Sequence, residues 1–161
     1  MSARHAVGLA LLILACGKSQ KVESTPDSSF ARLQQRGETA MGVNQYTSQH
    51  VFEPLPDGGR IVLQREQQDS VGTETIRAHM RTIAAAFSSG DFAIPGFVHS
   101  TADVPGTADM RKLRSEITYA PHDLPRGGEV VITTRNPKAI TAIHDFLAFQ
   151  RMDHRAGMHM E

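Results

Sequence analysis

Histidine and methionine are the residues of this chain whose side chains could do chemistry. The 161 residues include eight His and seven Met but a single Cys. Imidazole and thioether groups bind late transition metals, and thioether sulfur is selective for soft Cu(I). The chain lacks the spacings that mark a serine nucleophile elbow, a phosphate-binding loop, a dinucleotide-binding loop or a zinc protease helix. The residue types therefore favour metal binding over catalysis.

One dense group of candidate ligands lies in the last ten residues. Five of them are Met or His: Met152, His154, Met158, His159 and Met160. This stretch extends beyond the last apolar stripe of the chain, so it could supply soft donors for Cu(I) without disturbing a fold. The alternative interpretation is a polar tail whose Met residues are incidental.

A second group of candidate ligands is spread over the body of the chain. It comprises His50, His99, Met110 and His144, and His154 could join it. His79 and Met41 belong to the same wider group of possible ligands. Because imidazole ligands must be unprotonated, binding at this body site is predicted to weaken as the pH falls through the ordinary histidine pKa of about 6.5. Each residue alone could equally be a hydrogen-bonded histidine at the edge of a core or, for Met110, a core filler.

The N-terminus resembles a bacterial lipoprotein signal. A cationic start precedes a mostly apolar run that is too short to span a bilayer. The stretch Ile13–Cys16 resembles a lipobox, which implies cleavage after residue 15 and lipidation of Cys16. Residues 1–15 are therefore predicted to be a signal peptide, and residues 16–35 a lipidated polar tether. Gly17 rather than Asp follows Cys16, which by resemblance to lipoprotein sorting favours the outer membrane.

An internal repeat indicates the fold of the remainder. Leu55–Gln64 (LPDGGRIVLQ) aligns without a gap with Leu124–Thr133 (LPRGGEVVIT), at an offset of 69 residues. Each Gly-Gly pair lies between two strand-like runs and so predicts a β-hairpin, with the glycines at positive backbone angles.

A helical pattern follows each predicted hairpin. The first runs from about Thr73 to Ser88, and the second from Pro137 to Asp153 with Asn136 as its cap. The sequence therefore predicts an α+β fold. Its duplicated ββα unit would form a four-stranded antiparallel sheet with helices on one face.

The duplication also gives expectations for particular positions. Gly58 and Gly127 should occupy equivalent turns, and His79 and His144 equivalent points of the two helices. A shared seam between the helices could then bring candidate ligands together.

The predicted domain covers residues 36–155, and residues 156–161 remain as a Met/His tail. Between the repeats, the stretch from Phe92 to Phe97 is predicted to be a loop because it contains Pro-Gly. Residues 107–115 are predicted to form a short helix.

Several short motifs are spread over residues 36–156. They are Met41-Gly-Val-Asn-Gln45, His50-Val-Phe52, Val104-Pro-Gly106, Pro125-Arg-Gly-Gly128 and His144-Asp-Phe-Leu-Ala-Phe-Gln150. Together they resemble a family of small bacterial exported proteins and lipoproteins of uncharacterised function. This chain departs from the family pattern at Asn44, where Asp is usual, and at Val51, where a second His is usual. Some members carry the label aspartate carbamoyltransferase, but that enzyme needs two domains and a longer chain.

The charge balance narrows the classes of partner. Seventeen basic and seventeen acidic side chains give a formal net charge of zero, so no nucleic-acid partner is expected, and membrane attachment would come from acyl chains alone. We therefore expect an envelope lipoprotein facing the periplasm that binds a transition metal, copper first, for sequestration or delivery to a metal-transfer protein. The alternatives are a non-catalytic adaptor or scaffold domain with incidental His and Met residues, and a small metal-dependent enzyme.

Overall fold

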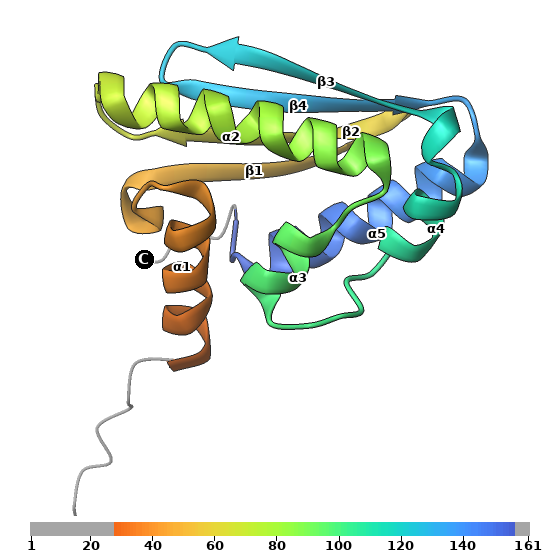
Figure 1. Cartoon of the computed structure of the whole chain (residues 1–161), viewed down its shortest axis with the longest axis horizontal. Coiled ribbons are helices and arrows are strands. Elements are labelled where there is room, and N and C mark those ends of the chain that lie inside the picture. Colours follow the sequence, from red (N-terminus) through yellow and green to blue (C-terminus); the bar gives the residue numbers. More distant parts are fainter. Residues whose placement is uncertain (1–27, 157–161) are drawn as a thin grey trace, which may run out of the picture.

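The two repeat units form one antiparallel sheet, as the internal repeat predicts (Figure 1). The computed structural model describes residues 28–156. Strands β1 (Ser48–Leu55) and β2 (Gly58–Arg65) form the first hairpin, and β3 (Ile117–Leu124) and β4 (Gly127–Thr134) form the second. The strand order is β1-β2-β4-β3, so the two strands that begin with Gly-Gly pair at the centre and β1 is an edge.

Both predicted long helices are confirmed. Helix α2 (Ser70–Ser89) begins slightly earlier than expected, because the Asp69 carboxylate accepts a hydrogen bond of 2.9 Å from the Gly72 backbone N–H. Helix α5 (Pro137–Asp153) has the predicted bounds, and the Asn136 side chain caps it. Their apolar stripes cover the same face of the sheet and build the core with it.

Each long helix packs on the hairpin of the other repeat unit. Helix α2 lies mainly on β3 and β4, whereas α5 lies mainly on β1 and β2. Two side chains mark this exchange: Arg77 of α2 donates to the Leu124 carbonyl at 2.7 Å, and the His144 ring of α5 bonds the Leu55 carbonyl at 2.9 Å. Leu55 and Leu124 are equivalent in the repeat, so Arg77 and His144 occupy equivalent positions.

The predicted equivalence of His79 and His144 is therefore wrong. The caps Asp69 and Asn136 are 67 residues apart, which makes Phe146 the counterpart of His79. The hairpins are offset by 69 residues, and the connection from strand to helix is two residues shorter in the second unit. The residues of α2 and α5 are therefore equivalent at an offset of 67, and not at the offset of 65 that would pair His79 with His144.

Gly58 and Gly127 do occupy equivalent positions, at the starts of β2 and β4. A Cβ at Gly58 would lie 2.0 Å from the Ile132 carbonyl oxygen, and one at Gly127 would lie 2.0 Å from the Leu63 carbonyl oxygen. Of these two glycines only Gly58 has a positive φ, +149°. The prediction of positive angles is therefore wrong for Gly127, where the close approach of two backbones requires glycine.

Two segments that were predicted to lack regular structure are helical. Residues 28–35 of the expected tether belong to α1 (Ser28–Met41), whose buried side includes Leu33. Most of the loop expected from Phe92 to Phe97 belongs to α3 (Ala93–His99), where proline is tolerated in the first turn. The short helix expected over residues 107–115 is confirmed as α4 (Thr107–Lys112) and a 3₁₀ turn that follows it.

Candidate functional site

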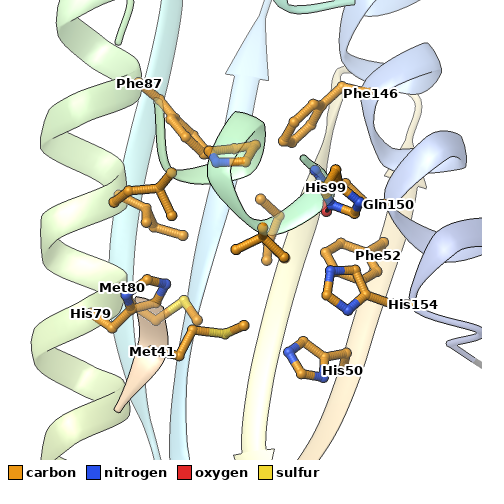
Figure 2. Close-up of a pocket in the computed structure, with 15 residues that line it drawn as sticks. Met41, His50, Phe52, His79, Met80, Phe87, His99, Phe146, Gln150 and His154 are labelled. Atoms are coloured by element: carbon orange, nitrogen blue, oxygen red, sulfur yellow. Dashed lines mark hydrogen bonds between the residues drawn. The ribbon is translucent and has the colours of Figure 1, made fainter. Parts of the chain in front are cut away.

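A small cavity lies where β1, α2, α3 and the end of α5 meet (Figure 2). Its volume is about 60 Å³, and most of its lining side chains are apolar. One histidine reaches it from each of these four elements: His50 from β1, His79 from α2, His99 from α3 and His154 from the residue after α5. The fold thus gathers histidines that are up to about a hundred residues apart in the chain.

Three rings form a stack on one side of this cavity. The His154 ring centroid lies 5.0 Å from that of His50, with an angle of 21° between the planes, and 5.4 Å from that of Phe52. His50 and Phe52 are two residues apart on β1 and so project from the same face, with centroids 5.9 Å apart. The arrangement fixes both imidazoles within an aromatic, mostly apolar setting.

Two nitrogens of this stack have no hydrogen-bond partner within residues 28–156. They are Nε2 of His50 and Nδ1 of His154, and both atoms are buried. A buried polar atom without a partner costs about 1–3 kcal/mol, so native proteins leave few of them unless a water, ion or ligand binds there. These two nitrogens are the strongest indication of a binding site in the described part of the chain.

Burial keeps His50, His79 and His154 neutral. It lowers the pKa of His50 to about 4, with a further contribution from nearby His79, and lowers the pKa of His79 itself to about 4. Burial, followed by the proximity of His50 and His99, also holds the pKa of His154 well below its ordinary value. The sequence predicts that protons compete with a metal for these histidines near pH 6.5. For His50 this prediction is wrong, because its ring stays neutral until about pH 4.

His99 connects α3 to the end of α5. Its Nδ1 bonds the Asp153 carboxylate, and its Nε2 lies 2.7 Å from the side-chain oxygen of Gln150. The ring also packs edge-on against His154, with centroids 5.0 Å apart. Both ring nitrogens are thus engaged by residues of α5, and the ring contacts His154. The role of His99 as a metal ligand stays a prediction.

Two methionines bring thioether sulfur to the same cavity. Met41, the last residue of α1, and Met80 of α2 are buried and line it. Figure 2 shows their side chains between His79 and His50 in this view. The cavity therefore combines neutral imidazole with thioether sulfur, two uncharged side-chain types that bind Cu(I).

Carboxylate and thiolate ligands do not add to these imidazole and thioether donors among the described residues. Among residues 28–156, no three His, Cys, Asp or Glu side chains are grouped so that they could hold a metal ion. A metal at this cavity would therefore need thioether as well as imidazole ligands. That requirement favours Cu(I) over Zn(II), which prefers imidazole, thiolate and carboxylate.

The predicted body site is assembled only in part. His50, His99 and His154 converge as expected, but Met110 and His144 do not line the cavity. Met110 is wholly buried in the core on α4, and His144 bonds the Leu55 carbonyl. His79, Met41 and Met80 line the cavity in their place. The spacing of the two helix caps is the sequence signal that could have separated His79 from His144.

The remaining predicted site residues are Cys16, Met158, His159 and Met160, and they lie outside the residues that the structure describes. None of the helices between residues 28 and 156 is long and apolar enough to cross a membrane. A scan against family models, a search of curated proteins and a search of solved structures found no match to this chain. The function is therefore inferred from the chemistry of the cavity.

Proposed function

We propose that this protein binds Cu(I) at the cavity between β1, α2 and the end of α5, and that it sequesters or delivers the metal as an envelope lipoprotein. One observation carries the proposal. Two buried imidazole nitrogens, Nε2 of His50 and Nδ1 of His154, have no partner within residues 28–156, and the cavity beside them is also lined by the thioethers of Met41 and Met80.

A comparison of histidines within the molecule supports this interpretation. His99 and His144 have hydrogen-bond partners, as is usual for histidines at the edge of a core. His50 Nε2 and His154 Nδ1 differ from them, because these buried nitrogens have no partner within residues 28–156. If these two histidines only filled the core, selection for stability would favour apolar side chains of similar size at both positions.

The charge of the cavity favours a monovalent metal ion. Its lining within the described chain includes four histidines and two methionines but neither Asp nor Glu. In a mostly apolar cavity without an anionic ligand, the two positive charges of a divalent ion would have no compensating negative charge. Burial of such unpaired charge has a high free-energy cost. Cu(I) carries a single charge and accepts soft neutral donors. The same reasoning disfavours a hydrolytic zinc site, and thus the metal-dependent enzyme.

The test is a Cu(I) titration against a chromophoric chelator under anaerobic conditions. The full chain would carry Cys16→Ser, which removes its one thiol. We expect His50→Ala and His154→Ala each to weaken Cu(I) binding by about 100-fold, because even residues that support metal ligands contribute 10–100-fold to affinity. His122→Ala is the matched control, because His122 is exposed on β3 and does not line the cavity.

The outcome also decides between the two classes of function. Equal Cu(I) affinity in the parent chain and in His50→Ala/His154→Ala, with both proteins folded by circular dichroism, would rule out this metal site. The interpretation as an envelope adaptor would then take its place.

The membrane anchor is a separate part of the proposal and has its own test. If Cys16 is acylated, the protein should fractionate with membranes and partition into detergent, because two or more acyl chains give stable anchoring. Cys16→Ala should lose the acylated species and remain unprocessed at this position. Recovery of the unsubstituted protein as a soluble, cleaved and unmodified periplasmic species would refute the anchor.

A further inference from the structure

A groove of about 780 Å³ follows the free edge of β1. Its lining includes every residue of β1 from Ser48 to Pro54, and the end of α5 as far as Ala156 also lines it. Successive residues of a strand project to opposite faces of a sheet, so a groove that both sets of residues line lies along the edge of the strand. Among the described strands, β1 pairs only with β2 (Figure 1). Its other edge therefore presents backbone groups that can pair with a further extended segment.

The register of the first hairpin identifies the backbone groups that face this edge. The Glu66 N–H donates to the Thr47 carbonyl at 3.1 Å, which continues the pairing of Ser48 with Arg65. Because hydrogen-bonded and non-hydrogen-bonded pairs alternate along an antiparallel ladder, the odd-numbered residues of β1 bond β2. The backbone groups that point away from β2 belong to Ser48, His50, Phe52 and Pro54. A proline fits this set, because an N–H at such a position makes no bond within the sheet.

Two buried amide oxygens indicate that the groove has an occupant. Gln34 and Gln45 line it, and their side-chain oxygens have no hydrogen-bond partner within residues 28–156. These two residues are only 9% and 4% exposed. Native proteins satisfy nearly all buried polar atoms, and an amide oxygen can only accept. The occupant must therefore supply N–H or O–H donors, which a metal ion does not have.

The charge of the groove favours an acidic occupant. Three arginines line it against two glutamates: Arg126, Arg151, Arg155, Glu53 and Glu66. The Glu53 carboxylate already forms an ion pair with Arg60, which does not line the groove. The lining thus has an excess of positive charge, and a carboxylate that reaches one of the arginines would form a charge-assisted hydrogen bond.

We infer that the groove binds an extended, acidic segment of a partner protein, which joins the sheet as a fifth strand beside β1. The lined part of β1, Ser48 to Pro54, spans roughly 23 Å, so the segment is about seven residues long. Its backbone pairs with the outward groups of β1, and its N–H donors also reach the oxygens of Gln34 and Gln45. A second copy of this chain fits less well, because pairing of two β1 strands would bring two sets of arginines to one interface.

The docked segment would lie next to the proposed metal site, because His50 and His154 line both the groove and the cavity. The inference itself goes beyond the Cu(I) proposal and does not depend on it. The unpartnered oxygens, the open edge and the arginines are present without a metal.

The first test is a selection of random peptides displayed on phage, with the metal-free Cys16→Ser chain as the target. We expect the selected peptides to be rich in Asp, Glu and β-branched residues. Synthesised peptides should bind Gln34→Leu and Arg151→Gln about 10-fold more weakly than the parent chain, because each variant loses one hydrogen bond to the segment. Lys138→Gln is the matched control, because Lys138 is exposed on the same helix as Arg151 and does not line the groove. Circular dichroism checks that the three variants are folded.

The second test is amide hydrogen exchange of the parent chain, measured by NMR with and without a selected peptide. We expect the peptide to protect the N–H groups of Ser48, His50 and Phe52. The N–H groups of Gln49 and Val51 should change little, because they already bond β2. This alternation is a signature of strand pairing that binding through side chains alone would not give.

Each contrary result overturns the inference in its own way. Selection of no peptide whose affinity depends on Gln34 or Arg151 would show that the groove is not a docking site. Enrichment of Lys and Arg in the selected peptides would contradict the acidic partner. Protection without the alternation along β1 would place the peptide on another surface. A concentration-dependent dimer of the metal-free chain with the same alternation would make a second copy the occupant. None of these results bears on Cu(I) affinity, so the proposed function stands or falls separately.

Discussion

Acidification from pH 7 to about pH 4 should lower the free energy of unfolding of the metal-free protein by roughly 3 kcal/mol for each of His50 and His79. In the unfolded chain these histidines take up protons near pH 6.5, whereas in the folded protein burial delays protonation to about pH 4. Between these two values the unfolded state binds more protons, so folding stability falls as the pH falls. Urea unfolding at several pH values across this window measures the loss.

Variants separate the histidine contribution from that of the carboxylates. His79→Leu should remove its own share of the loss, whereas His122→Leu should not, because His122 is exposed. A hydrogen bond from the Gly72 N–H lowers the pKa of the Asp69 carboxyl. Its contribution to stability is therefore lost mainly as the pH falls through and below the ordinary value of 3.8, at the acidic end of this window. An unchanged pH dependence in His79→Leu would show that this ring is not kept neutral by the fold.

Gly127→Ala should destabilise the protein by roughly 3 kcal/mol, near the upper end of the range for overpacked sites. The added Cβ would lie 2.0 Å from the Leu63 carbonyl oxygen, which belongs to the backbone of the neighbouring central strand. Neither strand can move away without breaking the pairing between the two hairpins. Thermal or urea unfolding gives the difference in the free energy of unfolding.

Gly37→Ala is the matched control for this substitution. Its Cβ would approach Gln45 and Met41 at 3.2 Å, but these atoms belong to flexible side chains that can move. Alanine also favours a helix by about 1 kcal/mol relative to glycine. We therefore expect Gly37→Ala to stay within about 1 kcal/mol of the parent protein. Equal destabilisation by the two substitutions would contradict the assignment of a backbone clash at Gly127.

The overall fold could be predicted because local signals and the repeat agree. The matching Gly-Gly hairpins and the capped apolar stripes that follow them predict the same ββα order twice. Helix α3 was not predicted, because Pro95 and Gly96 both disfavour helices in general. In the structure Pro95 lies in the first turn, where its missing N–H costs little, and the Asp91 side chain accepts a hydrogen bond from the Ala93 N–H.

The candidate site could be predicted only where the sequence fixes the direction of a side chain. His50 projects from a strand face, and His154 follows a helix whose length was predicted, so their convergence was within reach. The position of His144 depends on the length of a connection, and two residues there decide which carbonyl it meets. Met41 is a possible ligand from its residue type, but helix α1, which places it at the cavity, could not be predicted because its buried side includes a polar residue and a glycine.

Because each long helix packs on the hairpin of the other repeat unit, neither half of the chain can bury its own apolar surfaces alone. An isolated first half would retain α2 but lack the hairpin that α2 covers, and its own hairpin would remain without α5. In two copies of such a half, the helix of each copy could cover the hairpin of the other. This exchange of helices is the arrangement of a domain-swapped homodimer. A fusion of that dimer into one chain would fold as a single cooperative unit. Cu(I) at the proposed cavity, which is lined by residues from both halves, would then bind only the native state and stabilise it by mass action.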